Sequence, residues 1–254
     1  GWKQLWIVDP IDGTKEFIKR NGEFTVNIAL IEKNKPVIGV IYVPVTKTLY
    51  YAIVAEQKAY KTILEKHRVA ENELFASKDA MSIEKEDNET IKVVGSRSHK
   101  SAETEAFIQS IEQQGKQVEI VSKGSSLKFC LVAEGAADIY YRSGPTMEWD
   151  TAAGHAVVLA AGGVVVKEDD SQFCYNKENL EIFAKFFGIP YKEMKLFNLS
   201  QIVYSGVNVL DLLGIIYSNV SIVSKSKQYT EFIKLLKNEK SMKIHIIFFV
   251  LWYN

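Results

Sequence analysis

The first part of the chain carries the alternation of apolar and polar residues that is typical of β-strands. Residues 5–8 form a short apolar run, and from residue 23 to residue 31 apolar side chains recur at every second position. Residues 37–43 and 49–55 are again mostly apolar, and short polar connections join these stretches. Consecutive strands with short turns predict an antiparallel meander. Residues 65–92 are rich in charge and lack periodicity, so we expect a solvated excursion there.

Predicted helices and strands alternate along the second part of the chain. Three segments have apolar residues on one helical face, begin near a Ser or Asp suited to an N-cap and end at a Gly: residues 98–115, 125–135 and 150–163. Short apolar stretches beside them predict strands: residues 91–95, 118–121, 137–141 and 164–166. A meander followed by this alternation predicts a mixed α/β fold, with an N-terminal antiparallel sheet and a C-terminal α/β sheet.

The chain divides into three predicted segments. Residues 1–90 form the meander half, residues 91–178 the α/β half, and residues 179–254 a C-terminal tail of atypical character. The chain starts at Gly1 without Met and enters a predicted strand at once, so we expect it to be N-terminally truncated. Residues 203–224 of the tail contain several polar side chains, which makes them a poor membrane span. We therefore do not expect membrane contact by the tail.

Composition and charge narrow the classes of function. The 254 residues include 31 basic and 31 acidic side chains, so no net charge attracts nucleic acid, and no nucleic-acid partner is expected. Cys130 and Cys174 are too few for a disulfide framework and lack metal-ligand spacing, and we expect both to be buried. A chain with so few cysteines fits a reducing compartment. We expect a cytoplasmic protein, with a peripheral position at a membrane as the alternative, and leave its oligomeric state open.

The segment from Asp9 to Thr14 has the residue types of a metal and phosphate site. We expect a strand to end at Asp9 and Pro10 to force a turn, so that Asp9 and Asp12 converge on one point. Two carboxylates this close stay ionised together when a cation lies between them, and an all-oxygen site suits Mg²⁺. Gly13 and Thr14 then begin a short predicted helix, whose free amides favour an anion. The alternative is an Asx turn in which both aspartates only accept backbone hydrogen bonds.

Asp150 is the candidate for a third carboxylate. It precedes a predicted helix, and as an N-cap alone it needs no further role. Together with Asp9 and Asp12 it completes the carboxylate set of a two-metal site for phosphoryl transfer. The metal hypothesis therefore requires a residue far along the chain to fold next to the first two.

These motifs resemble those of a known family. Asp9 to Thr14 reads DPIDGT, and residues 149–153 read WDTAA and precede a Gly-Gly pair. Both resemble signatures of the inositol monophosphatase superfamily, whose members are Mg²⁺-dependent, lithium-sensitive phosphatases. Four segments resemble its 3'(2'),5'-bisphosphate nucleotidase branch: residues 9–44, 95–99, 124–130 and 144–154. The resemblance implies the sugar-phosphatase-like alternation of helix and sheet layers.

The resemblance implies roles for five residues at the metal site. Asp9 is implied to bridge two Mg²⁺ ions, the carbonyl of Ile11 to complete the coordination of one, and Asp12 and Asp150 to hold the other. Thr14 is implied to help orient a water that attacks phosphorus directly. Two or three Mg²⁺ ions are implied, with Li⁺ as an inhibitor.

The resemblance also implies the residues that bind substrate. The amides of Gly13 and Thr14 are implied to bind the phosphate that is cut. The second phosphate, the base and the ribose of a nucleotide are implied to contact side chains farther along the chain: His99, Ser125, Lys128 and Arg142. A small bisphosphorylated nucleotide suits this division, because one phosphate needs metals and the other needs Arg and Lys donors.

The function expected from the resemblance is hydrolysis of the 3'-phosphate of 3'-phosphoadenosine 5'-phosphate to AMP and phosphate, a reaction of sulfur metabolism. Residues 1–90 then carry the metal site and residues 91–178 the nucleotide-binding segments. The family places a further acidic motif upstream of DPIDGT, and this chain lacks it, so we expect the full-length parent to be active and this chain to be impaired. Two alternatives stay open: an inositol or sugar phosphate phosphatase of the same superfamily, and a non-catalytic phosphate-binding protein.

Overall fold

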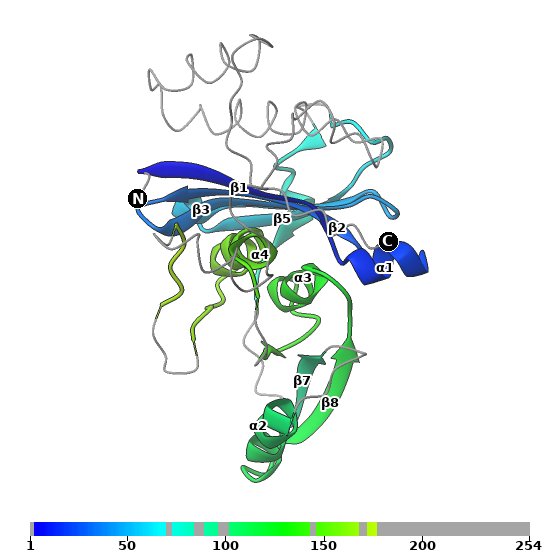
Figure 1. Cartoon of the computed structure of the whole chain (residues 1–254), viewed down its shortest axis with the longest axis vertical. Coiled ribbons are helices and arrows are strands. Elements are labelled where there is room, and N and C mark those ends of the chain that lie inside the picture. Colours follow the sequence, from blue (N-terminus) through cyan, green and yellow to red (C-terminus); the bar gives the residue numbers. More distant parts are fainter. Residues whose placement is uncertain are drawn as a thin grey trace, which may run out of the picture.

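The computed structural model describes residues 3–69, 73–83, 89–95, 102–142, 146–167 and 172–176. In this part of the chain the larger sheet is an antiparallel meander: β1 Gln4–Asp12, β2 Thr25–Glu32, β3 Lys35–Val43, β4 Thr48–Ile53, β5 Lys58–Ile63 and β6 Ala80–Met81. A smaller parallel sheet has the order β8-β7-β9: β7 Thr90–Gly95, β8 Gln117–Ser122 and β9 Ile139–Tyr140. The described α-helices are α1 Thr14–Lys19, α2 Ala102–Glu112, α3 Leu127–Ala133 and α4 Glu148–Ala160. Figure 1 shows α3 and α4 between the two sheets and α2 beside the smaller one.

The expected mixed α/β fold is confirmed, and the meander is longer than expected. β5 and β6 were not predicted, because Lys58 and Lys61 interrupt the apolar pattern of β5 and because β6 has only two residues. The prediction of a solvated excursion after residue 65 is wrong for Val69 and Leu74, which are buried in the apolar cluster on one face of the larger sheet. The strand predicted over residues 164–166 is also wrong, since in the described part of this region only a single bridge joins Val166 to Gln172.

β1 does not end at Asp9 as expected, but continues to Asp12 through a β-bulge. Asp9 lies opposite Asn27 of β2 and Asp12 lies opposite Thr25, so the two residues between the aspartates face a single residue of β2. Residues three apart in a regular strand point to opposite faces. The extra residue puts Asp9 and Asp12 on the same face, and Pro10 fits there because it has no N–H to donate.

α4 packs closely on that same face of the larger sheet (Figure 1). Its buried surface consists mostly of small residues, and Ala153 and Ala156 lie over Gly39 of β3. A Cβ at Gly39 would overlap the carbonyl oxygen of Ala153 and would lie 2.6 Å from the Cβ of Ala156. The backbone of the helix therefore rests directly on the strand, which fixes the height of α4 above the sheet.

α4 begins two residues before Asp150, so the predicted N-cap role of Asp150 is wrong. The N-cap is Met147, and Asp150 occupies the third helical position. Its Oδ2 accepts the backbone N–H of Met147 at 3.2 Å and the hydroxyl of Thr146 at 3.1 Å. This is one half of a capping box, with Asp where Glu or Gln is usual. The helix start thus holds one oxygen of Asp150 in place.

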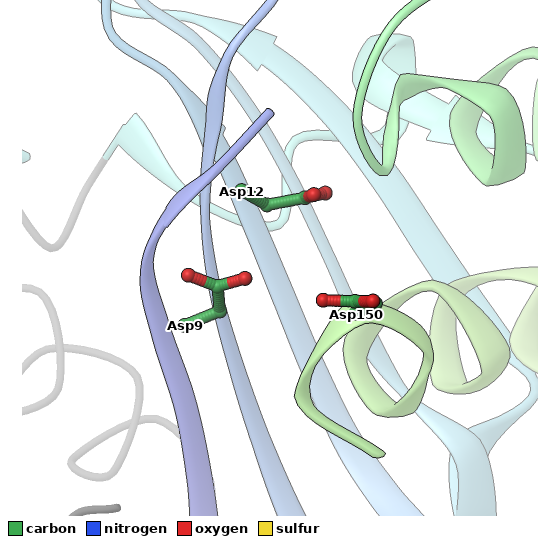
Figure 2. Close-up of side chains that lie close together, drawn as sticks. All are labelled: Asp9, Asp12 and Asp150. Carbon is green, nitrogen blue, oxygen red and sulfur yellow. The ribbon is translucent and has the colours of Figure 1, made fainter. Parts of the chain in front are cut away.

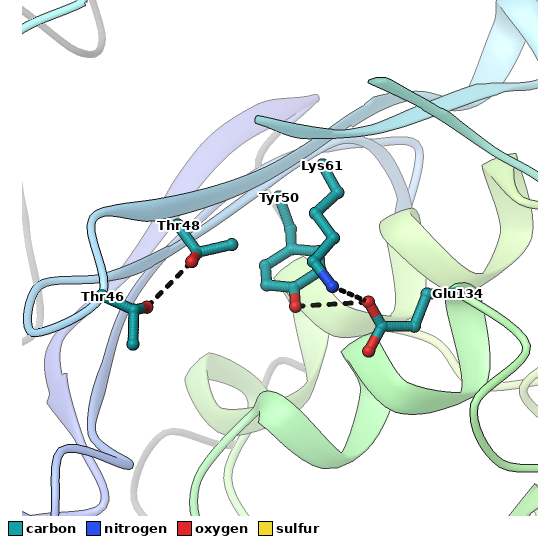
Figure 3. A network of polar contacts seen from close by, with 5 residues as sticks. All are labelled: Thr46, Thr48, Tyr50, Lys61 and Glu134. Carbon is teal, nitrogen blue, oxygen red and sulfur yellow. Dashed lines mark hydrogen bonds and ion pairs between the residues drawn. The ribbon is translucent and has the colours of Figure 1, made fainter. Parts of the chain in front are cut away.

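α3 is joined to the larger sheet by a group of polar contacts (Figure 3). Lys61 of β5 forms an ion pair with Glu134, which follows α3, and the hydroxyl of Tyr50 on β4 donates to the same carboxylate at 3.5 Å. Burial raises the pKa of Tyr50, so the phenol stays neutral and remains a donor. These contacts link residues far apart in the sequence and hold the C-terminal end of α3 on β4 and β5.

A buried contact in α4 is expected to respond to pH. Nδ1 of His155 lies 3.0 Å from the hydroxyl of Tyr175, and burial lowers the pKa of His155 from 6.5 to about 4. Between these values the unfolded chain binds a proton at this residue and the folded chain does not. We expect the free energy of unfolding to fall as pH decreases through this range, by up to about 3 kcal/mol from this residue.

Thermal unfolding at a series of pH values, for the chain and a His155→Gln variant, isolates that contribution. The difference in unfolding free energy between the two proteins is expected to shrink as pH decreases from 6.5 toward 4. A difference that does not depend on pH would contradict the buried, neutral imidazole.

The remaining expectations concern the cysteines and the tail. Cys130 is completely buried as predicted, whereas Cys174 is exposed, so that prediction is wrong for Cys174. Among the helices of the described residues, none is long and apolar enough to cross a membrane. The predicted tail, residues 179–254, lies outside the described residues, and the division into three segments stays a prediction.

Candidate active site

Three carboxylates from distant parts of the chain meet at the end of β1. Asp9 and Asp12 come from the two sides of the bulge, and Asp150 comes from the first turn of α4. Each offers one oxygen, and these three oxygens lie within 4.8 Å of one another. Figure 2 shows the side chains converging from the strand and from the helix. Asp150 therefore lies where the metal hypothesis requires it, and its role as a ligand stays a prediction.

Each of the three carboxylates has one oxygen held by protein donors. Oδ1 of Asp9 accepts the backbone N–H of Ile11 at 3.0 Å. Oδ2 of Asp150 is held by the start of α4, and Oδ2 of Asp12 accepts several side-chain donors. Within the described residues no donor contacts the second oxygen of any of the three. The cluster thus presents one available oxygen from each carboxylate, which is the donor set that a hard divalent cation takes.

The electrostatics of the cluster favour a cation. Burial raises the pKa of Asp9 well above its ordinary value of 3.8, and the charges of Asp12 and Asp150 raise it further. Burial, followed by the charge of Asp12, also raises the pKa of Asp150. The hydrogen bond from Ile11 opposes the rise for Asp9 only in part. The hydrogen bond from Met147, followed by the charge of Arg142, does the same for Asp150. A bound divalent cation would offset the repulsion and keep all three groups ionised.

The residues predicted to bind the reacting phosphate lie at the turn after β1. Gly13 has a φ of 85°, a conformation that residues with a Cβ adopt only with strain. A Cβ at Gly13 would lie 3.0 Å from the Cβ of Ser125, so the loop before α3 packs against this turn. α1 begins at Thr14 and has only six residues, so its dipole is short. An anion at this turn would therefore be bound mainly by the free backbone amides.

The basic residues predicted to bind substrate gather around Tyr140. Nζ of Lys128 donates to the carbonyl oxygen of Ser125 at 2.8 Å and lies 5.5 Å from the centroid of the Tyr140 ring. Nη1 of Arg142 donates to the hydroxyl of Tyr140 at 3.5 Å. Burial lowers the pKa of Lys128, Asp12 raises it, and Arg142 lowers it further. Lys128 and Arg142 thus form one basic group beside the carboxylates.

Ser125 and His99 were also predicted to bind substrate, and the structure describes only Ser125. Ser125 is buried in a left-handed conformation with a φ of 45°, and its hydroxyl has no hydrogen-bond partner among the described residues. Such an orphaned buried hydroxyl is costly unless something binds to it. His99 lies outside the described residues, so its predicted role is not placed by the structure.

Three residues of the site were missed by sequence reasoning. Thr25 and Asn27 belong to β2 and are almost completely buried, and Ser126 precedes α3 with 1% of its surface exposed. All three donate to Oδ2 of Asp12. The available signal was polar residues alternating with apolar ones in a strand that is buried on both faces. Ser126 was considered only as a helix cap, yet its side chain makes no capping bond.

The fold and the carboxylate cluster agree with a sequence-family comparison. The model of the inositol monophosphatase family matches residues 1–197. The chain therefore belongs to the inositol monophosphatase family, as the resemblance of its motifs implied.

Particular relatives place the chain within that family. It is 52% identical over 164 residues to the 3'(2'),5'-bisphosphate nucleotidase CysQ of Salmonella typhimurium and 51% identical over the same length to that of Escherichia coli. Each match covers 65% of this chain and 59% of the relative. The chain thus spans about three fifths of the length of the curated relatives it matches.

Solved structures agree with this placement. The crystal structure of CysQ from Bacteroides thetaiotaomicron, a bacterial member of the inositol monophosphatase family, has a TM-score of 0.62 and 50% identity, and the match covers 71% of this chain and 68% of that one. An inositol monophosphatase from Zymomonas mobilis shares the fold, with a TM-score of 0.54, 20% identity and coverage of 69% and 63%.

Proposed function

We propose that the full-length protein is a Mg²⁺-dependent phosphatase that removes the 3'-phosphate of 3'-phosphoadenosine 5'-phosphate, giving AMP and phosphate. The observation that carries the proposal is the cluster of Asp9, Asp12 and Asp150 beside a basic group. The names of the CysQ relatives, which are about half identical to this chain over 164 residues, support the choice of a bisphosphate nucleotide.

The donor set fits Mg²⁺. Three carboxylates each present an oxygen without a protein donor among the described residues, and Ile11 lies in the bulge between the first two. Asp9, Asp12, Asp150 and the carbonyl of Ile11 would hold two or three ions in this proposal. Bound ions would supply Lewis-acid stabilisation of the phosphate charge and lower the pKa of water.

The chain's own residues would bind and orient the reacting groups. In the proposal the amides of Gly13 and Thr14 donate to the phosphate that is cut, and the hydroxyl of Thr14 orients the attacking water. These donors are fixed by the turn between β1 and α1 and need little reorganisation when charge develops on the phosphate.

The second phosphate would be recognised beside Tyr140. Lys128 and Arg142 carry the donors that a phosphate needs, and the buried hydroxyl of Ser125 adds a neutral donor. His99 belongs to the same set in the proposal. A nucleotide with two phosphates would thus bridge from the carboxylates to the basic group, whereas an inositol monophosphate would contact only the first.

A Lys128→Gln variant is expected to discriminate between substrates with one and two phosphates. Removing one charged donor from a partly desolvated phosphate site costs about 1.5–3 kcal/mol, so we expect KM for 3'-phosphoadenosine 5'-phosphate to rise at least tenfold. Activity on a monophosphate such as 2'-AMP should change little. Steady-state phosphate release measures both, and an equal loss on the two substrates would contradict the assigned contact.

The proposed function is tested by a substrate panel. Phosphate release is measured for 3'-phosphoadenosine 5'-phosphate, inositol 1-phosphate and fructose 1,6-bisphosphate, with and without Mg²⁺ and Li⁺. The chain alone is compared with the chain extended at its N-terminus by the part of the Salmonella relative upstream of the matched residues. The proposal expects the nucleotide to be cut best by the extended protein, in a Mg²⁺-dependent reaction that Li⁺ inhibits.

Two other results of the panel would replace the proposal. Preferential hydrolysis of a sugar phosphate would make the protein an inositol or sugar phosphate phosphatase. No release from any substrate by the extended protein, together with calorimetric nucleotide binding that does not depend on Mg²⁺, would make it a phosphate-binding protein.

A further inference from the structure

The geometry points to Ser126 as a positioning residue that orients Asp12 for cation binding, with Asn27 and Thr25 donating to the same carboxylate oxygen. This inference rests on the proposed metal site and adds residues that do not themselves contact a cation. It concerns how the ligand oxygens are held, and therefore the affinity of the site.

Oδ2 of Asp12 is surrounded by three side-chain donors. The hydroxyl of Ser126 lies 2.7 Å from it, and the hydroxyl of Thr25 and the amide of Asn27 each lie 3.3 Å from it. Because Oδ2 is engaged in this way, the carboxylate cannot rotate without losing these bonds. Oδ1 is then held in one direction, and no described residue donates to it.

Ser126 also joins the other parts of the site. Its hydroxyl accepts the amide N–H of Asn27 at 2.8 Å and lies 3.0 Å from the carbonyl oxygen of Asp150. A hydroxyl has a single proton, and the charged carboxylate of Asp12 is both nearer and the stronger acceptor. One buried atom therefore contacts β1, β2 and α4, the elements that carry or flank the three carboxylates.

The burial of these donors argues for a function beyond packing. Thr25, Asn27 and Ser126 are each at most 1% exposed, and burying polar side chains next to a carboxylate costs free energy unless they are well bonded. Hydrogen bonds to metal-ligating carboxylates orient the ligand, and their loss costs 10–100-fold in metal affinity in other proteins. The contact with Ser126 is the shortest of the three, so its loss is expected to have the largest effect.

The test is calorimetric titration of the purified full chain with MgCl₂ alone. We expect Ser126→Ala to raise the dissociation constant for Mg²⁺ about tenfold. The matched control is Thr62→Val, which also removes a buried hydroxyl that donates to an aspartate, Asp79, at 2.7 Å, away from the carboxylate cluster. Both variants are expected to unfold at a lower temperature, and only Ser126→Ala is expected to bind Mg²⁺ more weakly.

The outcomes separate this inference from the proposed function. A folded Ser126→Ala chain that binds Mg²⁺ as tightly as the unaltered chain overturns the inference and leaves the metal site standing. An unaltered chain that binds no Mg²⁺ overturns the metal site proposed for this chain, and the inference with it. If Ser126→Ala does not fold, Thr25→Val decides the question by the same criterion, with a smaller expected loss of affinity because its bond to Asp12 is longer.

Discussion

Replacing Asp9 by Asn is expected to weaken divalent-cation binding strongly while it makes the cation-free chain more stable. Asp9 is buried, and its charge is repelled by Asp12 and Asp150. Asn keeps an oxygen for the N–H of Ile11 but removes the charge. At pH 7 we expect the free energy of unfolding to rise by about 1 kcal/mol, and the affinity for Mg²⁺ to fall at least a hundredfold.

The size of the stability change depends on pH. Because folding raises the pKa of Asp9, the folded chain binds more protons than the unfolded chain above pH 3.8, and the charged residue becomes a growing penalty as pH rises. The advantage of Asp9→Asn should therefore be small near that pH and should increase toward neutrality. Chemical unfolding of both proteins in chelator measures it.

The prediction for Asp9→Asn has a matched control variant and a result that would contradict it. Asp79→Asn changes an aspartate that accepts a hydrogen bond from Thr62, and it should leave Mg²⁺ binding unaltered. If Asp9→Asn proves less stable than the unaltered chain in the absence of cations, the repulsion between the three carboxylates is not the dominant effect. Retained Mg²⁺ affinity would remove Asp9 from the proposed ligands.

Gly39→Ala is expected to destabilise the packing of α4 on the larger sheet. The added Cβ would overlap the carbonyl oxygen of Ala153, which belongs to the rigid backbone of α4 and cannot turn aside as a flexible side chain would. Either α4 moves away from β3 or the strand bends. We expect a loss of about 2–3 kcal/mol in the free energy of unfolding, within the range for overpacked cores.

The same substitution should also disturb the site, because α4 carries Asp150. A displaced helix moves Asp150 relative to Asp9 and Asp12, so Mg²⁺ affinity should fall together with stability. Gly95→Ala is the matched control, since among the described residues a Cβ there would meet Ile120 alone, at 3.5 Å, an ordinary contact. Urea unfolding compares the three proteins, and equal losses for the two variants would contradict the close packing of α4 on β3.

Much of the fold followed from local patterns. The period-two stretch became β2, the two mostly apolar stretches became β3 and β4, and the segments with apolar helical faces became α2, α3 and α4. β5 and the burial of Val69 and Leu74 were missed, because charged neighbours hide these apolar residues in the sequence while tertiary packing still covers them. The local sequence of a segment with both charged and apolar residues does not show which of its faces the rest of the protein will cover.

The charged residues of the candidate site were predicted, whereas the neutral residues that donate to Asp12 were missed. The motifs around Asp9 and Asp150 were distinctive enough to suggest a shared cation, and the structure brings both together with Asp12. Thr25 and Asn27 carried no such signal, because polar residues in a strand usually face water. Only the pairing of β2 with the bulged β1 turns them toward Asp12.

The sequence by itself determined the family, the order of most elements and the identity of the three carboxylates, because these depend on residue types and on short-range periodicity. The tertiary structure alone decided that Asp9 and Asp12 share a face, through one extra residue in β1. It also decided that the hydroxyl of Ser126 donates to Asp12 and does not cap α3. Both outcomes depend on strand register and on contacts between residues about a hundred positions apart, which no local pattern encodes.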